Sequence, residues 1–314
     1  MTAASRPGAL SASGAARARP GGRRGGRLRA RERAGLWFVL PALAVYLLFF
    51  GLPFLATLWL GFTDWGGVGW PDWTGMANYA RLAADRAMWG ALGNNLIWVV
   101  LGTAIPVLVG LVLAVMLWSD SRGSVAYRTA FFLPVILSPV VIGMIWGWIY
   151  NPLFGLLNTG LREVGLGRWA IGWLGEPSTA LYAVLVTAIW SYFGFCIVVL
   201  FAGLQKVDPE LVAAARVDGA SPVQRFRHVI VPQIAPVLTM VIVYTVIGGF
   251  NAFDMVWVMT QGGPNNASEV IATYTYEVAF RGNEYGYGAT LSMVMSAVAL
   301  LAAWATMALR RRWA

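Results

Sequence analysis

Six long apolar stretches constrain the fold of this sequence more than any other feature. They cover about residues 36–62, 92–118, 129–150, 180–204, 233–259 and 288–309. A helix needs about 20 apolar residues to cross the hydrocarbon core of a bilayer, and none of the stretches shows the period-two alternation of a barrel strand. Charged residues make up only 12% of the chain, about half the share typical of a soluble protein. The sequence therefore predicts an all-α, polytopic membrane protein with six transmembrane helices.

The basic residues are distributed unevenly over the segments between these stretches. The N-terminal segment, the loops after the second and fourth stretches and the C-terminal end together hold 18 of the 23 Lys and Arg residues. The other three loops hold 5. Because loops rich in Lys and Arg remain in the cytoplasm, both termini are predicted to be cytoplasmic, as an even number of spans also requires.

The N-terminal segment, residues 1–34, differs in composition from the transmembrane domain that follows it at residues 35–314. It is rich in Arg, Gly, Ala and Ser and carries nine arginines, so we expect a disordered basic tail. RNA or anionic-lipid binding is one interpretation of such a tail. The orientation rule favours a topology anchor in contact with membrane lipid, and no nucleic-acid partner is expected.

The cytoplasmic loop 205–231 carries two signals for the start of a helix. Asp208 is a capping residue followed by a proline and an acid, the order preferred at a helix N-terminus. Ser221 and Gln224 have the spacing of a capping box. Gly219 lies between the two signals, so the loop is predicted to form a helix, a glycine bend and a second helix. Its small and basic residues suit either docking of a partner or packing on the chain's own bundle.

The side chains required for most enzymatic chemistry are missing from the predicted spans. The only lysine, Lys206, is not part of a phosphate-binding P-loop motif. The only histidine, His228, falls in the cytoplasmic loop, so neither an intramembrane Ser/His pair nor a His/Cys metal site can be assembled. We therefore expect no catalytic residues, no metal and no cofactor, and any ATP hydrolysis must come from a partner chain.

One acidic residue, Asp254, falls inside a predicted span, and intramembrane ionisable residues are candidates for functional sites. Sugars are bound by carboxylates and amides together with aromatic rings that cover their apolar faces. Residues of these types surround Asp254 within two turns: Phe250, Asn251, Phe253 and Trp257. The alternative is that Asp254 caps an irregular helix end near Gly248 while the aromatic rings face lipid. Two other aromatic groups are interpreted as interfacial belts: Trp146, Trp148, Tyr150 and Trp190, Tyr192, Phe193.

The cytoplasmic loop resembles the EAA loop of binding-protein-dependent ABC importer permeases. The family pattern is E-A-A, three residues, G, nine residues and I-x-L-P. Ala214, Ala215, Gly219 and Pro232 match this pattern, whereas the motif glutamate falls on Ala213. Glu210 lies nearly on the same helix face and is the candidate replacement. The resemblance implies that this loop docks into an ATPase subunit through a set of coupling residues: Glu210, Ala213, Ala214, Ala215, Asp218, Gly219 and Pro232.

Beyond residue 35 the chain resembles the maltose-type subgroup of carbohydrate permeases. The most specific segments are 250–254 and 260–264, followed by Tyr274, Tyr276 and Phe280. This resemblance implies the fold of a type I ABC importer permease in the cytoplasmic membrane of a prokaryote. It also implies three kinds of partner: a second permease subunit, two copies of a cytoplasmic ATP-binding subunit and an extracytoplasmic solute-binding protein.

The implied substrate is a carbohydrate, a di- or oligosaccharide, carried by alternating access. Glycerol 3-phosphate or a polyol is the alternative cargo, although the predicted spans offer no basic residues for a phosphate. An ion-coupled secondary transporter is a further alternative, but Asp254 alone is thin support for a proton relay. A purely structural membrane protein would have no need for both the basic loop and the intramembrane acid.

Overall fold

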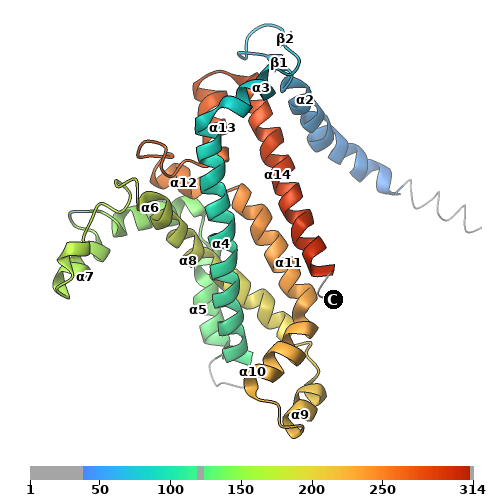
Figure 1. Ribbon diagram of the computed structural model, residues 1–314, viewed down its shortest axis with the longest axis vertical. Coiled ribbons are helices and arrows are strands. Elements are labelled where there is room, and N and C mark those ends of the chain that lie inside the picture. Colours follow the sequence, from blue (N-terminus) through green and yellow to red (C-terminus); the bar gives the residue numbers. More distant parts are fainter. Residues whose placement is uncertain (1–37, 119–123, 312–314) are drawn as a thin grey trace, which may run out of the picture. The chain divides into compact units, whose positions relative to one another are not determined.

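The computed structural model of the protein describes residues 38–118 and 124–311, which are mostly helical (Figure 1). The predicted tail at 1–34 lies outside the described residues. The chain divides into two compact units, Met1–Ala56 and Thr57–Ala314. A helix over Phe38–Leu60 includes a π-helical turn, η1 (Leu47–Gly51), and α2 (Leu52–Leu60). The remaining elements belong to the second unit.

Five helices of the described residues are long and apolar enough to cross a membrane. They are Phe38–Leu60, Arg86–Trp118, Ala180–Leu204, Pro222–Phe250 and Tyr285–Ala308. A sixth candidate is a bent pair, α5 (Ser124–Ile136) and α6 (Pro139–Ile149), whose two helices meet at 97°. The prediction of a polytopic helical membrane protein is confirmed at this level.

The stretch predicted as one helix at 129–150 is broken in the structure. Ser138 precedes Pro139 and has an extended backbone, with φ −61° and ψ 138°. A residue before proline is pushed out of the helical region by the proline ring, so the chain turns there and α6 begins with the proline at its first position. Mean hydropathy does not record such a turn, because the helices on both sides of it are apolar.

The stretch predicted at 233–259 is also divided. Three elements, α10 (Pro222–Arg225), η3 (Phe226–Ile230) and α11 (Val231–Phe250), form one continuous helix. It ends at Asn251, whose N–H donates to the Gly248 carbonyl at 3.0 Å. A separate short helix, α12 (Asp254–Met259), follows. The break therefore lies beside the residues predicted to bind substrate.

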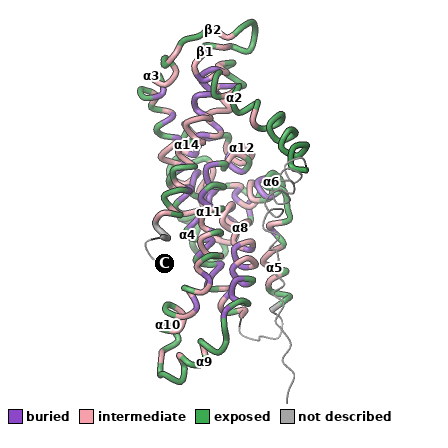
Figure 2. Tube along the Cα trace, turned by 90° about the vertical axis from the view of Figure 1, so that its right-hand side faces the viewer, coloured by how far each residue is buried: buried purple, intermediate pink, exposed green. Residues whose placement is uncertain are grey.

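The core of the second unit is formed by helices that lie side by side. α4 (Arg86–Trp118) packs against α8 (Ala180–Leu204) and α11, and α11 also packs against α14 (Tyr285–Arg311). Figure 2 shows that buried residues extend along most of α4 and α8. Gly110 permits the close approach of α4 to α8, because a Cβ at this position would lie 2.6 Å from the Cβ of Cys196.

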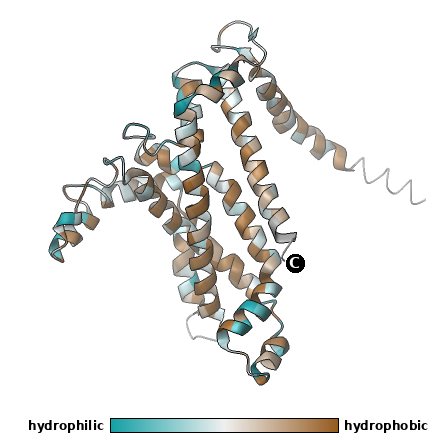
Figure 3. Ribbon diagram, in the orientation of Figure 1, coloured by the Kyte–Doolittle hydropathy of each residue, from teal (hydrophilic) through white to brown (hydrophobic). Residues whose placement is uncertain are grey.

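Hydrophilic residues gather at the two ends of the second unit (Figure 3). One end holds the antiparallel pair β1 (Thr63–Asp64) and β2 (Asp72–Trp73), with α3 (Ala77–Ala84). The other end holds α9 (Pro209–Val217) and α10. Shorter helices complete the loops: α7 (Leu156–Glu163), η2 (Gly167–Trp169), α13 (Ile271–Tyr276) and η4 (Glu277–Arg281).

Candidate functional site

A pocket of about 430 Å³ lies where α4, α8 and α11 meet the break after Phe250. α4 contributes Trp98, α8 contributes Ser191 and Tyr192, and α11 contributes Tyr244 and the glycines at 248 and 249. Pro139 and residues 251–255 also line the pocket. An apolar, aromatic wall with a few polar groups is typical of a small-molecule site.

The predicted substrate-binding residues divide into three groups. Asn251, Phe253 and Asp254 line the pocket. Trp257 lies one turn further along α12 and stacks on Phe253, with ring centroids 5.5 Å apart. Phe250 is only 1% exposed and packs into a core cluster with Val99 and Val246, so it supports the wall from behind.

Asp254 does not form the helix cap that the alternative interpretation required. It is the first residue of α12, it is exposed, and the cap position is occupied by Phe253 without a side-chain hydrogen bond to the helix. The carboxylate is therefore available to the pocket. Among the lining residues that the structure describes, it is the one charged side chain.

Tyr192 lines the pocket, although the sequence analysis interprets it as part of an interfacial belt. Its ring stacks on that of Tyr244, with ring centroids 6.4 Å apart. Its hydroxyl is buried and has no hydrogen-bond partner within the described part of the chain. Because a buried polar group without a partner costs free energy, this hydroxyl is suited to bind a polar ligand.

The belt interpretation was also wrong for Tyr150. This side chain is 4% exposed, and its hydroxyl donates to the Ala183 carbonyl at 3.1 Å. Trp146 contacts both Tyr150 and Trp190 through their rings. These aromatic residues therefore join α6 to α8. Trp148, at 72% exposed, has the surface position expected of a belt.

Two asparagines on α4 hold the broken segment in place. Asn95 is fully buried; its Nδ2 donates to the Gly249 carbonyl at 3.2 Å and its Oδ1 accepts from the Ile271 N–H at 2.7 Å. The Asn94 Nδ2 donates to the carbonyls of Ala267 and Glu269 at 3.1 and 2.8 Å. These bonds satisfy backbone groups that the end of α11 and the following loop would otherwise leave unpaired.

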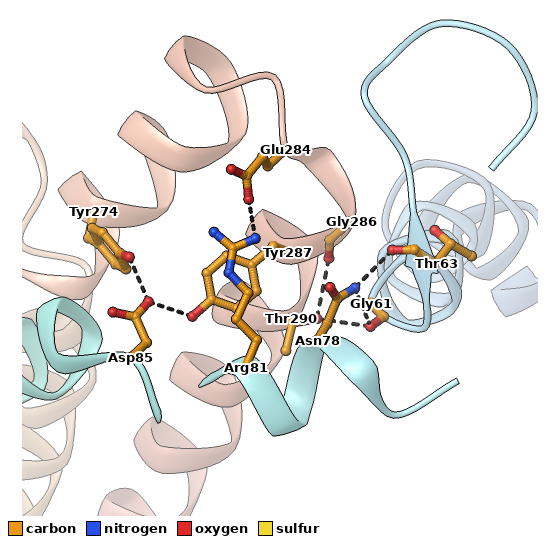
Figure 4. A network of polar contacts seen from close by, with 10 residues as sticks. All are labelled: Gly61, Thr63, Asn78, Arg81, Asp85, Tyr274, Glu284, Gly286, Tyr287 and Thr290. Atoms are coloured by element: carbon orange, nitrogen blue, oxygen red, sulfur yellow. Dashed lines mark hydrogen bonds and ion pairs between the residues drawn. The ribbon is translucent and has the colours of Figure 1, made fainter. Parts of the chain in front are cut away.

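A second polar network lies at the end of the unit that carries β1 and α3 (Figure 4). The Asp85 Oδ2 atom accepts hydrogen bonds from the hydroxyls of Tyr274 and Tyr287 at 2.6 and 2.5 Å. Arg81 forms an ion pair with Glu284, and its guanidinium lies 4.0 Å from the centre of the Tyr287 ring. The network joins α3 and the start of α4 to α13 and α14.

The ionisation of Asp85 reflects these contacts. Burial alone would raise its pKa, but hydrogen bonds from the two tyrosine hydroxyls and from the Met88 and Ala87 amides outweigh burial, so the pKa is lowered. The other carboxylate oxygen, Oδ1, accepts from the Met88 and Ala87 N–H groups at 3.2 and 2.9 Å at the start of α4. Asp85 therefore acts as an ionised cap for this helix.

The loop at 205–231 has the predicted shape. The Asp208 side chain accepts from the Glu210 N–H at 2.9 Å, and both halves of the capping box between Ser221 and Gln224 are present. Gly219 has a φ of 80°, which glycine adopts more readily than other residues. Of the seven coupling residues, six lie on α9 or the bend, and Pro232 is the second residue of α11. Because η3 links α10 to α11 without a break, the loop is continuous with a helix that lines the pocket.

Residues 106–314 match the family described as "Binding-protein-dependent transport system inner membrane component". The chain belongs to this family. It is therefore a permease subunit of an ABC importer, a transport component of the inner membrane and not itself an enzyme. The matched range contains the cytoplasmic loop and every residue predicted to bind substrate.

Individual relatives extend the match toward the N-terminus. The probable ABC transporter permease protein YurN of Bacillus subtilis is 36% identical over 84% of this permease and 91% of its own length. The xylose/arabinose import permease protein XacH of Haloferax volcanii is 34% identical over 85% and 83%, respectively. A chain of a bacterial ABC transporter involved in the import of the acidic polysaccharide alginate has a TM-score of 0.76 at 22% identity, with 92% of this permease and 99% of that chain covered. This likeness establishes the fold.

Proposed function

We propose that this permease forms half of the pathway for a neutral carbohydrate, a di- or oligosaccharide, across the cytoplasmic membrane of a prokaryote. In this proposal the bent pair α5–α6 counts as one span, which gives six spans with both termini in the cytoplasm. The distribution of Lys and Arg supports this orientation. A second, similar permease subunit completes the pathway.

The observation that carries the proposal is the pocket beside the break in α11–α12. The unpartnered Tyr192 hydroxyl, the Asn251 amide and the Asp254 carboxylate offer donors and acceptors for sugar hydroxyls. The rings of Trp98 and Phe253 offer apolar surfaces for the C–H faces of a sugar. This combination matches a polyhydroxylated, neutral ligand better than an ion.

The relatives support the same class of cargo. One is named for the import of xylose and arabinose. The pocket also bears on the alternative of glycerol 3-phosphate. The lining residues that the structure describes include an acid and no Lys or Arg, and an acid repels a phosphate rather than stabilising it.

We assign the cytoplasmic loop to energy coupling. The loop at 205–231 is proposed to dock into one of two copies of an ATP-binding subunit, and its contact surface is formed by Glu210 together with the exposed Ala213 and Ala214. Small side chains allow close approach of a partner, and Glu210 supplies the carboxylate that the family motif places at Ala213. Movement of the ATPase pair would reach the pocket through the continuous helix that begins at Pro222.

In the proposed cycle, an extracytoplasmic solute-binding protein delivers sugar to the end of the permease that carries β1 and α3. ATP binding closes the ATPase pair, and α9 and α10 follow this motion. The pocket then opens to the outside and receives the sugar. ATP hydrolysis returns the pocket to its inward-open state, from which the sugar is released. The break after Phe250 gives α12 freedom to move relative to α11.

Purification in mild detergent followed by reconstitution tests the proposal. We expect a P-loop ATPase and a second permease to co-purify with this chain. With the binding protein present, proteoliposomes should take up at least one member of a panel of labelled maltotriose, raffinose and xylobiose when ATP is enclosed. Labelled glycerol 3-phosphate, the alternative cargo, is tested in the same assay. Uptake of glycerol 3-phosphate alone, or of sugar without ATP, would contradict the proposal.

A further inference from the structure

A continuous row of aromatic rings extends from the pocket to the β1–β2 end of the second unit. The row begins at Phe253, a pocket residue that stacks on Trp257 with ring centroids 5.5 Å apart. The ring of Trp257 lies 4.6 Å from that of Tyr276, which lies 5.2 Å from Phe280. The row continues through two more contacts, Phe280–Tyr285 at 5.7 Å and Tyr285–Trp65 at 5.5 Å.

The row is not the product of a single helix. Two of its contacts, Phe253–Trp257 and Tyr276–Phe280, have the i,i+4 spacing of a helix. The other contacts join separate elements: Phe253 caps α12, which contains Trp257, whereas Tyr276 ends α13 and Phe280 lies in η4. Tyr285 begins α14, and Trp65 follows β1. Tertiary structure therefore brings together rings that lie more than 180 residues apart in the sequence.

The outer end of the row is held by close backbone packing. The Trp65 carbonyl accepts from the Gly286 N–H at 3.3 Å, and the Trp65 Nε1 donates to the Gly69 carbonyl at 3.1 Å. A Cβ added at Gly67 would lie 2.5 Å from the Tyr285 ring. The hairpin thus fixes the orientations of both rings, whereas Phe280 remains 60% exposed in the middle of the row.

An ion pair between Arg281 and Glu277 lies beside one ring of the row, that of Trp257. The Arg281 guanidinium lies 5.3 Å from the centre of the Trp257 ring and pairs with Glu277 at 2.9 Å. Both charged side chains are partly exposed, at 56% and 32%. Acyl chains do not solvate such a pair, whereas sugar hydroxyls hydrogen-bond to both groups. A charged pair beside the Trp257 ring therefore favours a carbohydrate over a lipid tail at this part of the row.

From these contacts we infer that the row is an entry path for sugar, along which pyranose rings move from the outer surface to the pocket. This inference rests on the proposed carbohydrate function and extends it. The centroids of neighbouring rings are 4.6 to 5.7 Å apart, which is about the width of a sugar ring. An oligosaccharide can therefore bind to the next ring before it leaves the last. The path predicts a preference for chains of several sugars, since these contact several rings at once.

Thiol labelling tests the path directly, because Cys196 is the only cysteine and is buried. The test uses Phe280→Cys in the complete reconstituted importer and a membrane-impermeant thiol reagent. The probe is whichever panel sugar is taken up. At about ten times its Kd, this sugar should slow labelling about tenfold, because about one site in eleven remains free.

Three controls make the result specific. Trp70→Cys is the matched variant. Trp70 is 93% exposed in the loop between β1 and β2, close in sequence to Trp65, but its ring has no ring contact among the described residues. Sugar should leave its labelling rate unchanged. Sugar-free binding protein measures shielding by docking alone, and the unmodified chain measures the background from Cys196.

A second variant tests the need for an aromatic ring. Phe280→Leu keeps the apolar volume and should raise KM for a trisaccharide about fivefold, whereas Phe280→Tyr should restore it. If sugar is transported but neither slows labelling nor depends on the ring, the path is overturned and the proposed function stands. Absence of labelling at Phe280→Cys would also overturn the path. If no panel sugar is transported or protects, both the path and the carbohydrate function fall.

Discussion

The Oδ1 atom of Asn95 accepts a 2.7 Å hydrogen bond from the backbone N–H of Ile271, which lies 176 residues later in the chain. The same side chain donates to the Gly249 carbonyl. One buried amide thus joins the end of α11 to the start of α13 across the break that borders the pocket. The shape of the candidate site therefore depends on a residue that does not line it.

Replacing Asn95 with leucine should destabilise the permease by about 2–4 kcal/mol, because a buried carbonyl and a buried N–H lose their partner together. Thermal unfolding in detergent measures this effect. Thr103→Val is the matched control on the same helix, since the Thr103 hydroxyl is buried without a partner in the described residues. That variant should be as stable as the parent. Equal stability of the two variants would show that Asn95 does not hold the break.

Asp85 should make stability depend on pH in the acidic range. Its pKa in the folded protein lies below the ordinary value of 3.8, so the ionised form is favoured by folding. Its contribution is complete above this value and is lost as the pH falls through the lowered pKa. Melting curves recorded between neutral pH and pH 3 should therefore show a decline that Asp85→Asn reduces.

At neutral pH, Asp85→Asn should lower Tm by about 2–4 °C, since the charged acceptor for the Tyr274 and Tyr287 hydroxyls is lost. Asp72→Asn is the control, because Asp72 is exposed on β2. An identical pH dependence in the parent and in Asp85→Asn would rule out the assignment of the acid transition to Asp85.

Tyr192→Phe should raise KM for sugar about three- to tenfold without lowering thermal stability. The hydroxyl has no partner in the described protein, so removing it takes away a ligand contact and leaves the packing of the ring intact. Tyr182→Phe is the control, since Tyr182 is exposed on the same helix and lies outside the pocket. A loss of stability with no change in KM would argue against a role in binding.

Gly219→Pro should abolish ATP-driven uptake while membrane insertion continues. Proline requires a φ near −65°, and Gly219 has a φ of 80°, so the bend between α9 and α10 cannot form. Gly165 has a nearly identical φ of 79°, and an added Cβ would meet no atom within 4 Å at either glycine. Gly165→Pro places the same backbone conflict outside the coupling loop, so it should leave uptake much less affected. Normal uptake by Gly219→Pro would refute coupling through the bend.

The parts of the fold that depend on neighbouring residues were predictable from the sequence. The caps at Asp208 and Ser221 and the bend at Gly219 were all identified correctly, because capping and left-handed glycine are local properties. The apolar helices were equally clear. The break at Ser138 was not predicted, and an irregular helix end near Asn251 entered only through the alternative interpretation of Asp254, since a hydropathy average does not distinguish a straight apolar span from a turning one.

The candidate site was only partly predictable for a related reason. Asn251, Phe253 and Asp254 were found because they are close in sequence and chemically suited to sugar. Tyr192 was missed because its place in the pocket depends on packing between α8 and α11. Asn95 was missed because its partners are long-range backbone groups, and backbone groups have no sequence signature.

The most direct test of the pocket's role measures ATP-dependent uptake of the panel sugars by importers that carry Asn251→Ala with Asp254→Ala. We expect the double variant to assemble with its ATPase and to hydrolyse ATP but to take up little sugar, whereas the control Glu163→Gln, at an exposed position, should transport normally. Sugar uptake by the double variant at the parental rate would contradict the assignment of this pocket to the translocation pathway.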